Sequence, residues 1–85
     1  MVMRGETRVT FYTRAGCHLC EEAKQALEVA RRRVRFQLEV VDIDQTAGLR
    51  ALYNEEVPVI AINGKKAFKH RLTADDFLKR LAART

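Results

Sequence analysis

The 85-residue sequence has no tryptophan, a single proline, four glycines and only two cysteines. It also lacks a long apolar run. The longest uncharged apolar stretch, Val57–Ile62, is far shorter than the roughly 20 residues that a membrane-spanning helix needs. The first residues, Met1–Glu6, contain no apolar segment of the kind found in secretory signal peptides. We therefore expect a cytoplasmic protein that does not enter a membrane, in a compartment where structural disulfides are rare.

The length and composition predict one domain over residues 1–85. Hydrophobic residues make up 47% of the chain and charged residues 32%, which is typical of a globular protein with a well-solvated surface. A chain of this size buries only about 60% of the surface of its unfolded state, so the core is modest. We expect the protein to be a monomer.

Basic residues outnumber acidic ones, with 16 Lys and Arg against 11 Asp and Glu and a net charge of +5. Their densest cluster, Arg31–Arg33, falls where a helix should end, and cations there complement the helix dipole. No basic cluster is interleaved with the aromatic residues that stack on bases, so we do not expect nucleic-acid binding. A basic surface also suits an acidic partner protein or an anionic thiol such as glutathione.

Hydrophobic patterning predicts the element order β-α-β-α-β-β-α. Because helices separate the first three strands, we expect those strands to pair in parallel through right-handed crossovers, and a hairpin at Asn63-Gly64 to close the sheet. The fold class is therefore α/β, a four-stranded mixed sheet flanked by helices. The predicted strands are Thr7–Tyr12, Arg35–Asp42, Val57–Ile62 and Lys65–Lys69, and the predicted helices run from Cys17 or Leu19 to Arg33, from Thr46 to Tyr53 and onward from Thr73.

The second predicted strand alternates in polarity. Phe36, Leu38 and Val40 point to one face and polar residues to the other, which is typical of an edge strand. The third strand, Val57–Ile62, is almost wholly apolar and so is expected at the centre of the sheet.

The two later helices have recognisable starts. Thr46 or Asp44 is expected to cap the short helix, and Thr73 the last one. The short helix has a small apolar face formed by Leu49, Leu52 and Tyr53, and the last helix has one formed by Phe77, Leu78 and Leu81.

The two cysteines form the motif Cys17-His18-Leu19-Cys20, which follows a strand and a turn and opens a helix. Unpaired N–H groups and the helix dipole at such a position stabilise a thiolate. Cys17 lies at the exposed start, and Cys20, on the same helical face, is within reach of a disulfide. We expect Arg14 and protonated His18 to lower the pKa of Cys17 further, and the acidic residues after Cys20 to oppose them.

Three other interpretations of the cysteine pair stay open at this point. A zinc site needs four ligands, and His18 and His70 are the only histidines that could complete it. The thiols can also be inert and buried, or hold an iron–sulfur cluster between two subunits. Asp42 and Asp44 suggest a carboxylate pair, but the end of an edge strand and a helix cap explain them more simply.

Three stretches resemble the small glutaredoxin-like proteins of the thioredoxin-like superfamily. They are Tyr12–Ala23 around the cysteines, Val40–Asp44, and Val57-Pro58-Val59. The resemblance implies a thioredoxin-like fold and a thiol–disulfide oxidoreductase, with no bound cofactor, that passes electrons to protein disulfides or glutathione mixed disulfides. Its own electrons would come from glutathione or from a reductase. The alternative is a thioredoxin-fold binding module that docks a partner or holds a metal or iron–sulfur cluster, with little catalysis.

The resemblance also implies roles for substrate-binding residues. Arg14 matches the basic residue that meets the glycine carboxylate of glutathione, and His18 lies between the two cysteines. The bond between Val57 and Pro58 is expected in cis, with the Val57 backbone N–H and C=O pairing with a bound chain. Glu56 stands where the family has threonine, and Lys69-His70-Arg71 stand where it has a glycine turn. These departures argue against the family's standard glutathione site.

Overall fold

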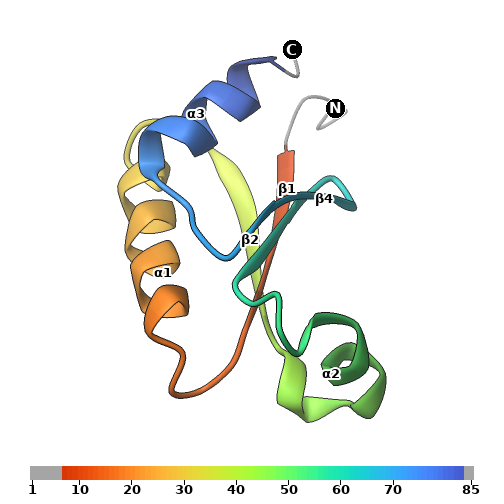
Figure 1. Cartoon of the computed structure of the whole chain (residues 1–85). Coiled ribbons are helices and arrows are strands. Elements are labelled where there is room, and N and C mark those ends of the chain that lie inside the picture. Colours follow the sequence, from red (N-terminus) through yellow and green to blue (C-terminus); the bar gives the residue numbers. More distant parts are fainter. Residues whose placement is uncertain (1–6, 84–85) are drawn as a thin grey trace.

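The computed structural model describes residues 7–83 (Figure 1). The described chain begins with a strand and ends with a helix, in the predicted element order apart from one added turn of 3-10 helix. The elements are β1 (Thr7–Thr13), α1 (His18–Arg31), β2 (Phe36–Asp42), the 3-10 turn η1 (Ile43–Gln45), α2 (Ala47–Tyr53), β3 (Val59–Ile62), β4 (Lys65–Lys69) and α3 (Ala74–Ala83).

The four strands form one mixed sheet in the order β2-β1-β3-β4. β1 pairs with β2 in parallel but with β3 in antiparallel, so that Val9 lies opposite both Leu38 and Ile62. The predicted parallel direction of the third strand is therefore wrong. A seven-residue helix such as α2 is about 10 Å long, whereas a seven-residue strand is about 23 Å, so α2 cannot return the chain across the sheet. β3 instead starts at the end where β2 stops and runs back.

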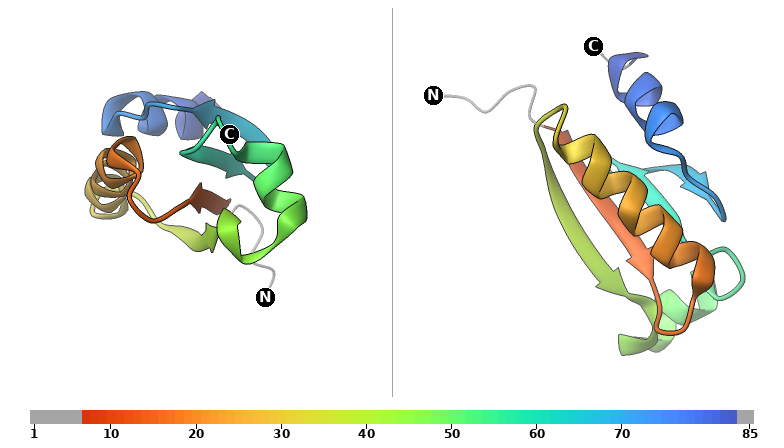
Figure 2. Two further views of the ribbon diagram at one scale, coloured as in Figure 1. Left: turned by 60° about the horizontal axis from the view of Figure 1, so that its bottom comes forward. Right: turned by 90° about the vertical axis from the view of Figure 1, so that its left-hand side faces the viewer.

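Helices α1 and α3 pack on one face of the sheet, and α2 lies on the other side (Figure 2). The main core lies between the sheet and helices α1 and α3, where Phe36 and Phe77 meet with ring centroids 5.2 Å apart. The predicted central strand β3 is buried along its whole length. Fully buried side chains of this core include Val9, Phe11, Leu27, Ile60, Ile62 and Phe77.

The turns and caps follow from particular residues. Asn63 and Gly64 have φ of 51° and 87°, the positive values that a tight hairpin turn requires, and this confirms the predicted hairpin. Thr73 accepts a hydrogen bond from the Asp76 amide at 3.1 Å and so caps α3, as predicted.

The predicted apolar faces of β2 and α2 are only partly correct. Val40 is 59% exposed, because β2 is an edge strand and Val40 borders a cavity at the start of α1. Leu52 is 65% exposed, and α2 contains no buried residue. Thr46 caps α2 by accepting the Leu49 amide, whereas Asp44 is not a cap. None of the helices within residues 7–83 has the length and apolar character needed to cross a membrane.

Candidate active site

Cys17 is the N-cap residue of α1, and its backbone is extended, with φ of −93° and ψ of 110°. Its carbonyl accepts the first helical hydrogen bond, from the Glu21 amide at 3.2 Å. Its sulfur accepts a hydrogen bond from the Cys20 amide at 3.1 Å. The sulfur thus takes the place that a serine or aspartate oxygen holds in an ordinary cap, and it faces the positive end of the helix dipole.

The two cysteines are joined in a disulfide, with their Cα atoms 5.1 Å apart. This distance is ordinary for a disulfide and follows from the three-residue separation along the first turn of α1. Cys20 is only 2% exposed and belongs to the core, whereas Cys17 is partly exposed. The arrangement therefore offers one accessible sulfur and one shielded sulfur, in the order that the sequence predicted.

The α2–β3 loop and the two cysteines lie at the same end of the sheet. Tyr12, near the end of β1, lies opposite Val59, at the start of β3. The loop that carries Cys17 therefore lies at the same end of the sheet as the Val57-Pro58 bond. That bond is cis, as the family resemblance predicted.

The Val57 backbone was predicted to pair with a bound chain through both its N–H and its C=O. Its N–H already donates to the Tyr53 carbonyl at 3.2 Å, so a bound chain would have to compete with α2 for this donor. Pairing with the Val57 carbonyl would need no such competition. Val57 itself is half-buried and packs against the core, as Cys17 does.

His70, which follows β4, also holds the α2–β3 loop, a role that sequence reasoning missed. It has a φ of 71°, a left-handed conformation, in the stretch where glycine was noted to be absent. Its amide donates to the Pro58 carbonyl at 2.8 Å, and its Nε2 lies 3.0 Å from the Glu55 carbonyl. A histidine before a helix carries no sequence signal for such a role, so only the fold reveals it.

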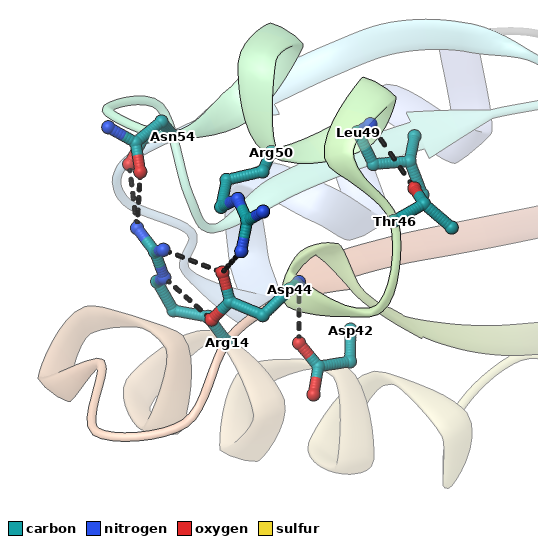
Figure 3. A network of polar contacts seen from close by, with 7 residues as sticks. All are labelled: Arg14, Asp42, Asp44, Thr46, Leu49, Arg50 and Asn54. Atoms are coloured by element: carbon teal, nitrogen blue, oxygen red, sulfur yellow. Dashed lines mark hydrogen bonds and ion pairs between the residues drawn. The ribbon is translucent and has the colours of Figure 1, made fainter.

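The Arg14 side chain points toward Asp44 and Asn54, which lie on either side of α2 along the chain (Figure 3). Its Nε and Nη2 donate to the two carboxylate oxygens of Asp44, at 3.2 and 2.7 Å. Its Nη1 donates to the backbone and side-chain oxygens of Asn54, at 3.2 and 2.8 Å. The predicted contribution of Arg14 to the Cys17 thiolate is therefore reduced, because Asp44 neutralises the guanidinium.

This pairing shifts the pKa of both groups. The hydrogen bond from Arg14 holds the pKa of Asp44 below its usual value, and the same bond raises the pKa of Arg14. Arg50 lies 4.0 Å from the same carboxylate, as a second cation. Sequence reasoning missed the partners Asp44 and Asn54, since 30 and 40 residues separate them from Arg14.

The two other predicted or noted polar residues also have partners. The His18 side chain is 86% exposed, with its Nε2 3.2 Å from Glu22 Oε2, one helical turn along α1. Glu56 pairs with Lys66 at 2.7 Å, and the hydrogen bond from Lys66 lowers the pKa of Glu56. Within residues 7–83 no three His, Cys, Asp or Glu side chains gather as metal ligands would.

Known proteins share the sequence pattern and the fold of this chain. Residues 8–82 match the family described as glutaredoxin-like domain (DUF836). The chain is 37% identical over 73 residues to the glutaredoxin-like protein YDR286C homolog of Dictyostelium discoideum, covering 79% of this chain and 68% of that one. The X-ray structure of protein XcR50 from X. campestris has a TM-score of 0.75 at 33% identity, over 88% and 96% of the two chains. A chloroplastic thioredoxin z shares the fold, with a TM-score of 0.76 at 18% identity, over 94% of this chain and 79% of that one.

Proposed function

The chain belongs to the glutaredoxin-like domain family and has the thioredoxin fold, and from this premise we propose that it is a thiol–disulfide oxidoreductase. Its attacking group is the sulfur of Cys17, and Cys20 resolves the intermediate. The substrates are disulfides of proteins or mixed disulfides of glutathione, and the reaction needs no bound cofactor.

One observation carries the proposal: the Cys17 sulfur accepts the Cys20 amide at 3.1 Å while capping α1. A hydrogen bond from a helix N-terminus favours the charged form of a thiol over the neutral form, and only the thiolate attacks a disulfide. The buried position of Cys20 does the opposite, since burial in apolar surroundings disfavours a thiolate. The two sulfurs are therefore suited to different steps.

The reaction proceeds in two balanced exchanges. The Cys17 thiolate attacks one sulfur of the substrate disulfide, a bond forms between Cys17 and that sulfur, and the other substrate sulfur leaves as a thiolate. Cys20 then loses its proton and attacks the Cys17 sulfur, and the second substrate thiolate leaves. The substrate has gained two electrons, and the protein holds the Cys17–Cys20 disulfide present in this structure.

The rest of the cycle needs a partner. A thiol reductant, either glutathione or the dithiol of a reductase, returns two electrons to the disulfide by the same chemistry. The compartment that supplies such thiols is the cytoplasm, where we place the protein, acting as a monomer. At the substrate side, the Val57 carbonyl next to Pro58 can accept a hydrogen bond from an extended chain that approaches Cys17.

The proposal is tested by trapping the intermediate. Reduced Cys20→Ser protein is mixed with hydroxyethyl disulfide, and the products are examined by mass spectrometry. We expect one adduct on Cys17, and no turnover at all in Cys17→Ser. A Cys20→Ser protein that forms no adduct, or a Cys17→Ser protein that keeps its activity, would contradict the assignment. Absence of exchange in the wild-type protein would favour a binding module instead.

A further inference from the structure

A cavity of about 450 Å³ lies where α3 meets the loop between α1 and β2. Leu78 and Leu81 of α3 and Val34 of that loop contribute its apolar surface. The end of α1 and the start of β2 lie at the end of the molecule opposite the start of α1, where the cysteines are (Figure 1). The two ends are separated by the length of β1, about 20 Å, so a ligand in this cavity leaves the cysteines accessible.

Arginines surround this cavity. Arg33 and Arg35 line it, and they also line a neighbouring cavity of about 260 Å³ together with Arg31 and Arg32. α1 ends at Arg31, with Arg32 as its cap residue, so Arg33 and Arg35 lie beyond the helix, in the loop that leads to β2. The helix dipole therefore explains the first two arginines but not the other two.

The charge of these four arginines is not neutralised within the part of the chain that the structure describes. Across residues 7–83 none of their guanidinium groups forms an ion pair, whereas those of Arg14 and Arg50 share the Asp44 carboxylate. The described residues that line the two cavities include no Asp or Glu. The cavity thus combines an apolar wall with a rim of uncompensated positive charge.

We propose that this cavity docks a segment of a partner protein in which Asp or Glu stands next to a large apolar side chain such as leucine. The apolar side chain packs against Leu78, Leu81 and Val34, the last of which is 37% exposed. The carboxylates pair with Arg33 and Arg35, because a guanidinium donates two parallel hydrogen bonds to a carboxylate. This docking surface is separate from the thiol chemistry proposed above.

The two features together argue against other occupants. A nucleic acid would use the arginines but would leave the apolar wall without a partner. The one aromatic residue that lines either cavity within residues 7–83, Phe36, is buried and cannot stack on a base. A second copy of this chain, placed symmetrically, would bring four more arginines to the same place, and their charges would repel.

The test uses a short synthetic peptide in which each leucine is flanked by Asp and Glu, titrated into the whole protein. One control peptide has serine in place of every leucine, and the other has lysine in place of every acidic residue. We expect the serine peptide to bind about tenfold more weakly, the effect of burying one leucine side chain, and the lysine peptide not to bind. The amide NMR signals of Val34, Leu78 and Leu81 should move with the acidic peptide, and that of Cys20 should not.

Variants of the protein separate the rim from the rest of the basic surface. Arg33→Gln/Arg35→Gln should weaken binding of the acidic peptide about fivefold, the effect of two exposed ion pairs, and an ionic strength of about 1 M should remove most of that difference. Lys65→Gln/Lys69→Gln is the matched control. It removes two charges from exposed positions of β4, at the sheet edge opposite β2, and should leave the affinity unchanged.

Several results would overturn the inference. They are equal losses in the two double variants, unmoved signals of Val34, Leu78 and Leu81, and a single-stranded oligonucleotide that displaces the peptide. Overhauser contacts between the methyl groups of Met1 or Met3 and Leu81 in the free protein would also overturn it, because the chain itself would then fill the cavity. Arg33→Gln/Arg35→Gln should reduce hydroxyethyl disulfide at the wild-type rate, so failure of docking leaves the proposed function intact, and failure of thiol exchange leaves the docking surface intact.

Discussion

Helices α1 and α2 both border the candidate active site, but they are held in different ways. α1 has 14 residues and buries Cys20, Ala23, Leu27 and Ala30 against the sheet. α2 has seven residues, none of them buried, and is held by its Thr46 cap and, through Asn54, by Arg14. α1 is anchored by apolar burial, whereas α2 is held by polar contacts at the surface and by the ring of Tyr53, which lies 4.6 Å from that of Tyr12.

The difference assigns separate tasks to the two halves of the site. Burial fixes α1 firmly, so the sulfur at its N-terminus keeps a constant relation to the Cys20 amide. Exposed polar contacts are weak and respond to pH, salt and substitution. The half between α2 and Pro58, where we propose that the substrate binds, is therefore the easier half to adjust without disturbing the nucleophile.

The largest effect expected from this comparison is on stability. Leu27→Ala should lower the free energy of unfolding by about 2–5 kcal/mol, because the side chain is 1% exposed and its removal leaves a cavity. Leu52→Ala, the same change on α2, should cost less than about 0.5 kcal/mol. Urea denaturation of both variants measures the two losses of unfolding free energy. Equal losses would show that α2 is packed as firmly as α1.

A smaller effect is expected at the α2 cap. Thr46→Ala removes the oxygen that accepts the Leu49 amide at 3.3 Å, and should cost about 1 kcal/mol. Hydrogen exchange at the Leu49 amide should become faster, while exchange at the Leu27 amide in α1 stays at the rate of the wild type. Thr46→Ser keeps the oxygen and serves as the control. Faster exchange in Thr46→Ser as well would mean that the hydroxyl is not the relevant group.

The smallest effect is a loosening of α2 in acid. The folded-state pKa of Asp44 is lowered, chiefly by the hydrogen bond from Arg14, so its contribution to stability is fully present above the unfolded-state value of about 3.9. The contribution is lost as the pH falls through the lower, folded-state value. The NMR signal of Arg14 Nε–H should therefore stay constant from about pH 7 to 5 and move below about pH 4.

Asp44→Asn is the control for that titration, because it has no carboxylate to protonate and its Arg14 signal should not move. A wild-type signal that stays constant down to about pH 2, or that moves near pH 6.5 with a histidine, would contradict the assignment to Asp44.

The sequence predicted the α1 half of the site better than the α2 half. The cysteine pair and the helix that Cys17 caps lie within one continuous segment, so local patterns were sufficient. The predicted direction of β3 was wrong because it rested on the alternation of strands and helices alone, although the predicted helix from Thr46 to Tyr53 is itself too short for a crossover. The Asp44 partner of Arg14 and the loop contacts of His70 depend on residues far apart in the chain, which no local pattern reports.

The central claim is that the N-terminus of α1 stabilises the Cys17 sulfur as a thiolate. The most direct test is the ultraviolet absorbance of the thiolate in reduced Cys20→Ser protein, followed as a function of pH, with reduced Cys17→Ser/Cys20→Ser protein as the baseline. The account predicts a Cys17 pKa below the value of about 8.5 for an ordinary thiol. A midpoint at or above that value would contradict it.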